Sequence, residues 1–176
     1  MIDEHWSTGV YHADLAVDSE AIAEAMYAAR GERNYAGGYT SYYDRHHVHD
    51  DEPFASLMTE IMRHAQAYMP PARGYLAPDK SWFSIMPSGG FHPAHAHPMS
   101  YLSGTFYPKS LGEIAFHDPR IGAVAASFTP DPIIVYQAVA GRVIMFPSWL
   151  LHEVPVNRSS EDRLSFSFNV RNIRSD

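Results

Sequence analysis

The sequence RLSFSFNVR, at residues 163–171, alternates strictly between two kinds of side chain. Leucine, phenylalanine and valine occupy the even positions, whereas arginine, serine and asparagine occupy the odd positions. Successive side chains of a β-strand point to opposite faces, so this period of two predicts a strand with one apolar and one polar face. The polar face either meets solvent or lines a barrel-like cavity that holds a polar ligand, and alternation alone does not distinguish the two.

Further short apolar runs, separated by glycine and proline, follow residue 80. In one of them the polar or hydroxyl-bearing residues Tyr101, Ser103, Thr105 and Tyr107 again share one face. Many short strands with turns between them predict a sandwich or barrel rather than a parallel sheet. The other candidate strands are Ser81–Met86, Tyr101–Tyr107, Glu113–His117, Ile133–Val139, Arg142–Phe146 and His152–Val156.

Two helices are predicted before the strands. The segment Ser19–Arg30 is rich in alanine and glutamate, and a glycine follows it. The segment Pro53–Met69 carries apolar residues at helical spacing and is followed by two prolines. The expected fold class is therefore mainly β with N-terminal helices, in which the helices brace one face of a β-sandwich.

Composition excludes several classes of protein. The chain has 176 residues, a formal net charge of −7 and no cysteine. The absence of a basic patch argues against a nucleic-acid or anionic-membrane binder, and the absence of thiols excludes disulfides, zinc fingers and cysteine nucleophiles. The apolar stretch 132–151 is interrupted by polar residues and reads as two strands rather than a membrane span. We expect a cytoplasmic protein without a signal peptide, and a homodimer is the commonest closed assembly open to it.

The histidines carry the strongest chemical signal. Two of the eleven, His95 and His97, stand one residue apart in GGFHPAHAHP (residues 89–98), and His152 ends the apolar run GRVIMFPSWLLH (residues 141–152). Without thiols, imidazole and carboxylate are the strong metal ligands available, and three protein ligands leave open positions for substrate and oxygen. Arg163 and Ser165 follow on the next strand, where a guanidinium and a hydroxyl would hold a carboxylate.

Four stretches together resemble the non-haem Fe(II)/2-oxoglutarate-dependent oxygenases, most closely the small bacterial 2OG-Fe(II) oxygenases. They are FHPAHAHPMSYLSGTFYP (91–108), LGEIAFHDPR (111–120), GRVIMFPSWLLHEVPV (141–156) and RLSFSFNV (163–170). The resemblance implies a single domain over residues 1–176, with a helical part at 1–79 and a double-stranded β-helix, or jelly roll, at 80–172. It also implies Fe(II), the cosubstrate 2-oxoglutarate, O2, and hydroxylation of a substrate with release of succinate and CO2.

The metal ligands implied by the resemblance are His95, His97 and His152. The family's usual pattern is His-x-Asp/Glu followed by a distal histidine, and His97 occupies the acidic position here. This departure indicates a three-histidine site, a carboxylate supplied by Asp118 or Glu113, or altered catalysis. We favour His97, which would leave the iron site one charge unit more positive and strengthen its hold on an anionic cosubstrate.

The resemblance further implies that Arg163, Ser165 and Tyr107 hold the far carboxylate of 2-oxoglutarate. Asn169, on the same strand face as Arg163, is a further candidate for the pocket or for the surface. An alternative function is a cupin-like three-histidine dioxygenase or isomerase that does not use 2-oxoglutarate, against which the Arg163/Ser165 pair argues. A second alternative is a binding domain that has lost the chemistry.

Three other features of the sequence are not assigned to the metal or cosubstrate site. The run 44–51, with histidines at 46, 47 and 49, is expected to be a solvated loop. Residues 118–132 form a long segment of the kind that often serves as a lid or binding loop. Trp82 and Trp149 are expected to pack in the core. The sequence leaves both a small molecule and a protein side chain open as the substrate.

Overall fold

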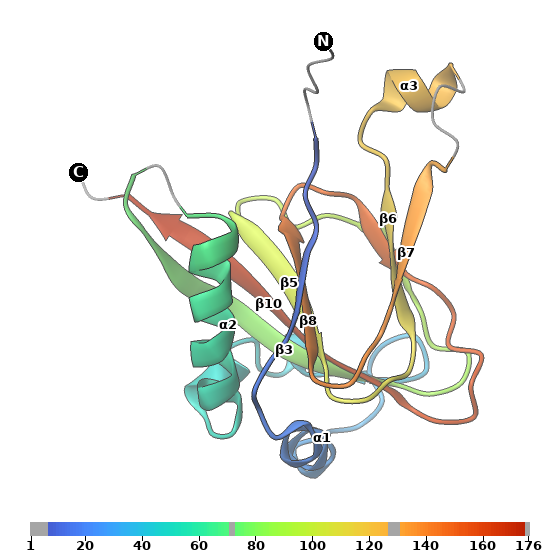
Figure 1. The fold of residues 1–176 in the computed structure, drawn as a ribbon. Coiled ribbons are helices and arrows are strands. Elements are labelled where there is room, and N and C mark those ends of the chain that lie inside the picture. The colour runs from blue at the N-terminus through green and yellow to red at the C-terminus, as the bar shows by residue number, and fades with distance from the viewer. Residues whose placement is uncertain (1–6, 71–72, 127–130, 175–176) are drawn as a thin grey trace.

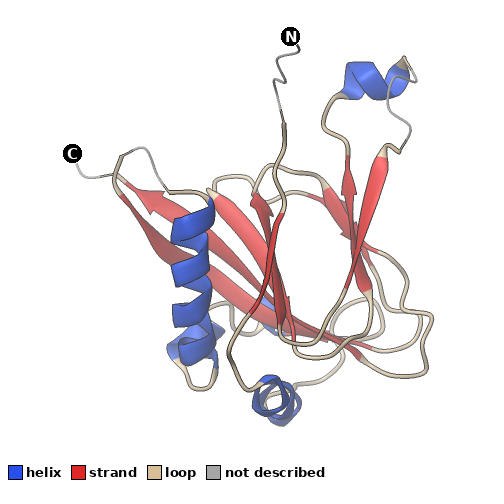
Figure 2. Ribbon diagram, in the orientation of Figure 1, coloured by secondary structure: helices blue, strands red, loops and turns tan. Residues whose placement is uncertain are grey.

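A computed structural model of the chain describes residues 7–70, 73–126 and 131–174. Two antiparallel sheets face each other, and the longest helix lies on the outer side of the larger sheet (Figures 1 and 2). The elements in chain order are β1 (Tyr11–Asp14), α1 (Ser19–Ala28), β2 (Tyr39–Thr40), the 3-10 turns η1 (Ser41–Tyr43) and η2 (Val48–Asp50), α2 (Phe54–Tyr68), β3 (Tyr75–Met86), β4 (His92–His95), β5 (Leu102–Tyr107), β6 (Glu113–His117), α3 (Ile121–Ala125), β7 (Ile133–Gln137), β8 (Arg142–Pro147), β9 (His152–Val154) and β10 (Arg163–Ile173).

The strands interleave between the sheets as a jelly roll requires. The larger sheet has the order β1-β8-β5-β10-β3-β2, and the smaller one has the order β4-β9-β6-β7. From β3 onward the chain crosses repeatedly from one sheet to the other, because β3, β5, β8 and β10 lie in the larger sheet whereas β4, β6, β7 and β9 lie in the smaller one. The predicted class, mainly β with N-terminal helices and a jelly-roll core, is confirmed.

Helix α2 covers the outer face of the larger sheet with the apolar stripe that its sequence predicts. Its first residue, Phe54, stacks on Phe83 of β3 and Phe166 of β10, with ring centroids 5.8 and 5.6 Å away. Burial of each such side chain contributes about 1.5–3 kcal/mol. At the start of α1, Asp18 caps the helix by accepting hydrogen bonds from the backbone N–H groups of Glu20 and Ala21.

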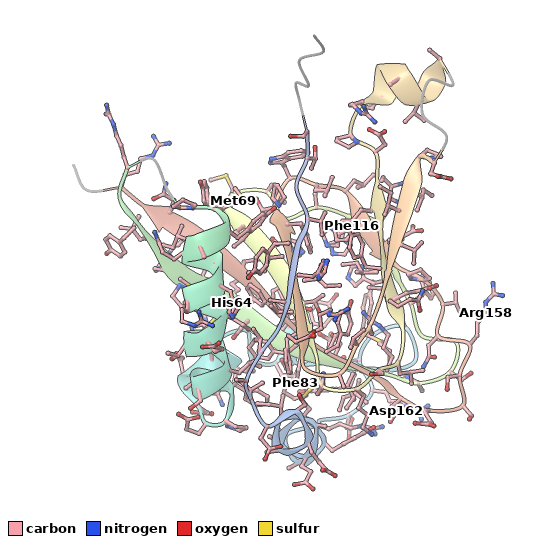
Figure 3. All side chains as sticks on the ribbon, in the orientation of Figure 1. His64, Met69, Phe83, Phe116, Arg158 and Asp162 are labelled. Carbon is pink, nitrogen blue, oxygen red and sulfur yellow. The ribbon has the colours of Figure 1, made fainter. Side chains whose placement is uncertain are left out.

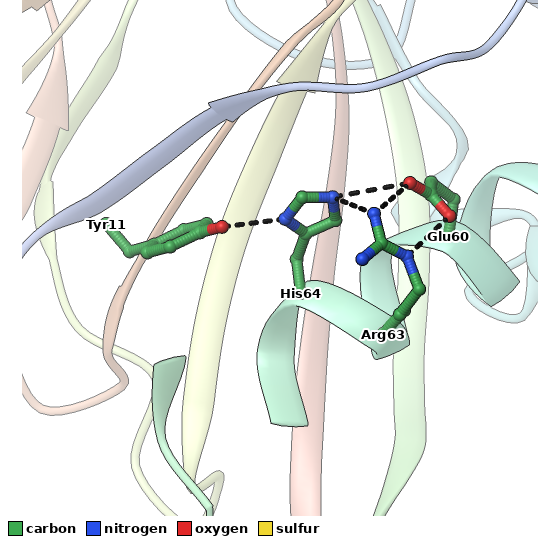
Figure 4. A network of polar contacts seen from close by, with 4 residues as sticks. All are labelled: Tyr11, Glu60, Arg63 and His64. Carbon is green, nitrogen blue, oxygen red and sulfur yellow. Dashed lines mark hydrogen bonds and ion pairs between the residues drawn. The ribbon is translucent and has the colours of Figure 1, made fainter. Parts of the chain in front are cut away.

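A polar network joins β1 to α2 (Figure 4). The hydroxyl of Tyr11 lies 2.7 Å from Nδ1 of His64, and Nε2 of His64 lies 3.3 Å from a carboxylate oxygen of Glu60. Arg63 holds the same carboxylate with two contacts of 2.7 and 3.1 Å. The N-terminal strand is therefore tied both to β8, its partner in the sheet, and to the helix that covers the sheet.

The space between the sheets has its own apolar cluster. Phe116 of β6 lies there (Figure 3), with its ring 4.8 Å from that of Phe146 on β8. Thr105 of β5 and Arg163, Ser165 and Ser167 of β10, all from the polar faces of their strands, line a cavity between the two sheets. The cavity-lining interpretation of the alternating strands is therefore the right one.

Several elements differ from the sequence-based expectation. The strands β1, β2 and β4 were not predicted, because each has four residues or fewer and lacks a run of alternating apolar residues. The predicted loop 118–132 contains the short helix α3, and its residues 127–130 lie outside the described part of the chain. No helix of the described chain is long and apolar enough to cross a membrane.

Candidate functional site

Three histidines from two strands converge on one point between the sheets. His95 is the last residue of β4, His97 follows it by two residues, and His152 is the first residue of β9. The Cα atoms of His95 and His152 are partners across the β4–β9 pair, and one nitrogen from each of the three rings lies within 4.8 Å of the others. The backbone N–H of His97 donates to the carbonyl of Ser148, which fixes the turn that carries the third ring.

Backbone carbonyls set the tautomer of two of these rings. Nδ1 of His152 lies 2.8 Å from the carbonyl oxygen of Leu150, and Nδ1 of His95 lies 2.8 Å from that of Pro93. A carbonyl oxygen can only accept, so each Nδ1 carries the hydrogen and each Nε2 keeps its lone pair. Metal-bound histidines are oriented in this way, with the second ring nitrogen donating to a carbonyl or carboxylate.

Burial keeps the three imidazoles neutral. Desolvation is the largest cause that lowers the pKa of His95 and of His97 to about 4 and that of His152 to about 3. The rings of Phe146 and Phe116 lie against His152, with centroids 4.6 and 6.2 Å away, and exclude water from its side. Neutral nitrogen ligands on one side of a dry cavity fit a borderline metal ion such as Fe(II).

A buried arginine lines the same cavity. Arg163, the first residue of β10, is 3% exposed, yet its side chain forms no ion pair with any described residue. Its Nε atom has no hydrogen-bond partner, and its guanidinium carbon lies 5.6 Å from the centre of the Tyr107 ring. A buried charge without a partner is costly, so an anion bound in this cavity beside Arg163 would offset that cost.

Hydroxyl-bearing residues share this part of the molecule with Arg163. Ser165 lines the cavity and is buried, and neither Oγ1 of Thr105 nor the hydroxyl of Tyr107 has a hydrogen-bond partner among the described residues. Asn169 is also buried, but its side-chain oxygen accepts a 2.8 Å hydrogen bond from Ser103, and it is not among the residues that line the cavity. Tyr107, which the resemblance placed with Arg163 and Ser165, is also not among the residues that line the cavity, whereas Thr105 is. Arg163, Ser165 and Thr105 therefore offer the donors that a carboxylate needs.

The two acidic residues considered as alternatives for the third metal ligand, Asp118 and Glu113, form hydrogen bonds with other side chains. Asp118 accepts three hydrogen bonds from Arg120. Glu113 accepts one from the side-chain amide of Gln137 on the neighbouring strand. Within the described residues, the group of side chains arranged for a metal consists of the three histidines alone.

The expectation for the two tryptophans was wrong. Trp82 lines the cavity beside His97, with ring centroids 5.7 Å apart, and Trp149 is 57% exposed on the turn between β8 and β9. A signal for Trp82 was present, because it shares a strand face with Ser84 and Met86 and alternates with the apolar Phe83 and Ile85. The histidines of the run 44–51 behave largely as expected. His46 and His47 are exposed, and His49 is partly buried against Ser81, 2.6 Å from its hydroxyl.

The sequence and the fold were compared with known proteins. The family model described as "Putative 2OG-Fe(II) oxygenase" matches residues 80–169, just over half of the chain. The protein therefore belongs to this family of Fe(II)/2-oxoglutarate-dependent oxygenases, which favours it over the cupin-like alternative. No curated protein matches the sequence.

Solved structures with the same fold include HygX from Streptomyces hygroscopicus with nickel, 2-oxoglutarate and hygromycin B bound. It is 12% identical, with a TM-score of 0.71 over 94% of this chain and 83% of that chain. AviO1 from Streptomyces viridochromogenes Tue57 is 14% identical, with a TM-score of 0.66 over 96% and 92% of the two chains. The epimerase SnoN, in complex with Fe3+, alpha ketoglutarate and nogalamycin RO, is 15% identical, with a TM-score of 0.66 over 94% and 79%. At these identities the likeness concerns the fold.

Proposed function

We propose that the protein hydroxylates a small molecule, with His95, His97 and His152 as the Fe(II) ligands and Arg163 as the residue that holds 2-oxoglutarate. The observation that carries this proposal is the buried guanidinium of Arg163, which lacks an anionic partner among the described residues and lines the same cavity as the three histidines. The solved structures of HygX and SnoN, which contain 2-oxoglutarate together with a small molecule, support a small-molecule substrate over a protein side chain.

The chain's own residues have distinct tasks in this reaction. The three neutral imidazoles would hold the ion through ring nitrogens, Nε2 in the case of His95 and His152, and three protein ligands would leave coordination positions for the cosubstrate, substrate and oxygen. Arg163, with the hydroxyls of Ser165 and Thr105, holds the far carboxylate of 2-oxoglutarate through charge-assisted hydrogen bonds. Phe146 and Phe116 exclude water from His152. Tyr107 contacts the guanidinium of Arg163 through a cation–π interaction. Asn169 accepts a hydrogen bond from Ser103 and so links β10 to the neighbouring strand β5.

The overall reaction balances with O2 as the oxidant. When bound, iron(II) supplies the redox chemistry that couples decarboxylation of 2-oxoglutarate to oxidation of the substrate. One oxygen atom enters the substrate, where a C–H bond becomes C–OH, and the other enters succinate as CO2 is released. Two of the four electrons that reduce O2 come from 2-oxoglutarate, and two come from the substrate C–H bond.

The test of this proposal is a binding titration without oxygen. Fe(II) and then 2-oxoglutarate are titrated into the protein and into two variants, Arg163→Gln and Arg171→Gln. Arg171 lies on the same strand but is exposed, so it controls for the loss of a positive charge on β10. We expect Arg163→Gln to bind Fe(II) normally and 2-oxoglutarate at least about 10-fold more weakly, because a hydrogen bond to a charged group contributes about 1.5–3 kcal/mol. Equal 2-oxoglutarate affinities in the two variants would show that the carboxylate is held elsewhere.

A further inference from the structure

A second cavity adjoins the first and is lined by a ring of seven aromatic side chains in successive contact. Starting from His97, the circuit runs through Trp82, Tyr42, Tyr43, Tyr35 and His92, and it returns through His95 to His97. The centroids of successive rings lie between 4.0 and 6.2 Å apart. We call this cavity the aromatic pocket. All seven rings line it, and two of them are proposed metal ligands, so a molecule in the aromatic pocket touches the metal centre.

The aromatic pocket has no charged lining. Besides the seven rings, it is lined by Thr40, Ser84 and Met86, and no aspartate, glutamate, lysine or arginine takes part. A charged group in this pocket would lose hydration without gaining a charged partner from the lining, which is costly. The lining therefore favours an uncharged group.

The size of the aromatic pocket limits the part of a molecule that it holds to about one ring. Its volume is about 190 Å³. A cavity of about 150 Å³ accommodates benzene, so this pocket holds one six-membered ring and a few substituents.

Hydroxyl groups are spread among the rings. Thr40 and Ser84 are bonded to each other at 3.1 Å through their hydroxyls. The phenol of Tyr35 also lines the pocket, and burial raises its pKa, so it stays protonated and can donate a hydrogen bond. Aromatic faces interspersed with hydroxyls match a ring that presents C–H groups on its face and hydroxyls at its edge.

We propose that the aromatic pocket binds one uncharged, hydroxyl-bearing six-membered ring, and that this ring is the part of the substrate that is presented to the metal. This inference rests on the proposed function, because it assigns the substrate class of the same site. A saturated sugar ring and a phenol share this chemistry, and the experiment below distinguishes them.

The test uses ring probes that differ in charge. p-Cresol, 4-methylbenzoate, 4-methylbenzylammonium and methyl β-glucopyranoside are each titrated by calorimetry into the protein loaded with Fe(II) and 2-oxoglutarate without oxygen, and into the metal-free protein. We expect p-cresol or the glucoside to bind at least about fivefold more tightly than either charged probe. Comparison of p-cresol with the glucoside then shows whether the pocket prefers an aromatic or a saturated ring.

A matched pair of variants locates the binding. Tyr43 and Tyr75 are exposed to similar degrees, 62% and 59%, but only Tyr43 lines the aromatic pocket. We expect Tyr43→Ala to weaken binding of the preferred probe about fivefold, the loss expected for one aromatic contact, and Tyr75→Ala to leave it unchanged. A charged probe that binds as tightly as the neutral ones, or equal losses in the two variants, would overturn the inference.

The same titrations separate the two proposals. If Fe(II) and 2-oxoglutarate bind but neither neutral ring does, the substrate class is wrong and the proposed function stands. If Fe(II) and 2-oxoglutarate do not bind, the proposed function fails, whereas the titration of the metal-free protein still decides whether the aromatic pocket takes the ring.

Discussion

His95 and His152 are Cα partners across the β4–β9 strand pair, and the centroids of their rings lie 4.3 Å apart. Fifty-six positions of sequence separate them, yet strand register alone brings them together. An irregularity in the register between His92 and His95 accompanies this pairing. The proposed metal site thus depends on how two strands pair, and each proposed ligand can be tested singly.

His152→Ala is expected to lose Fe(II) binding, because it removes one of three ligands and leaves a void beside Phe146. Fe(II) affinity should fall more than about 100-fold, the upper end of the loss seen when even an outer partner of a ligand is removed. Metal content after anaerobic loading and desalting measures this loss. His12→Ala is the control, because His12 is exposed on β1. Retention of a full equivalent of iron by His152→Ala would refute the ligand assignment.

His97→Asp should keep the metal and weaken the hold on 2-oxoglutarate. The substitution restores the His-x-Asp pattern but makes the site one charge unit more negative, and even in bulk water one charge pair at 4 Å is worth about 1 kcal/mol. We expect about fivefold weaker 2-oxoglutarate binding by anaerobic calorimetry. His97→Asn, which changes the shape of the side chain without adding charge, separates the two effects. If His97→Asp and His97→Asn bind 2-oxoglutarate equally, charge does not set the affinity.

Gly112→Ala is expected to displace the side chain of Arg163 from the position proposed to hold 2-oxoglutarate. Gly112 has φ +98°, and a Cβ atom there would lie 2.5 Å from Cδ and 2.7 Å from Nε of Arg163. The left-handed backbone and the close approach both favour glycine at this position. We expect about 10-fold weaker binding of 2-oxoglutarate, with Fe(II) binding unchanged. Gly122→Ala is the control, because a Cβ atom at Gly122 meets nothing within 4 Å. An unaltered 2-oxoglutarate affinity in Gly112→Ala would mean that Arg163 tolerates the shift.

The metal-free protein should lose stability in mild acid. The pKa of His95 and His97 is about 4 and that of His152 about 3 in the folded chain, against an ordinary 6.5. Below pH 6.5 the unfolded chain therefore binds more protons than the folded chain, and the free energy of unfolding falls as the pH drops towards 4. Each histidine contributes about 1.4 kcal/mol per pH unit.

Urea unfolding of the metal-free protein at pH 7 and pH 5 measures this effect. In His152→Gln, the fall in unfolding free energy between the two pH values should be smaller than in the unsubstituted chain by about 2 kcal/mol. An identical fall in both proteins would show that His152 does not titrate in this way.

Periodicity and residue chemistry were enough to predict much of this architecture. The alternation in 163–171 predicted β10 and its polar face, and the helical spacing in 53–69 predicted α2. The candidate ligands were visible because His95 and His97 stand one residue apart, His152 ends an apolar run, and the chain has no thiols to serve as ligands. Their convergence on one metal was predicted from the family resemblance and not from periodicity, because it depends on the register between β4 and β9.

Other parts of the site depend on contacts that the sequence does not display. The role of Gly112 arises only because β10 brings Arg163 against a loop fifty-one positions earlier. The aromatic pocket likewise combines Trp82 of β3 with tyrosines from the segment between α1 and α2, whose strand β2 has only two residues. A local sequence pattern cannot reveal the lining of this pocket, because the residues that form it come from separate segments of the chain.

The position of β4 at the edge of the smaller sheet has one more consequence. In the described part of the chain, this four-residue strand pairs with β9 alone. An ion bound by His95, His97 and His152 would therefore add a second link between the edge strand and its neighbour. Bound iron would then stabilise the β4–β9 pairing in addition to supplying the redox chemistry. In the metal-free protein, β4 would separate from β9 before the other strands separate.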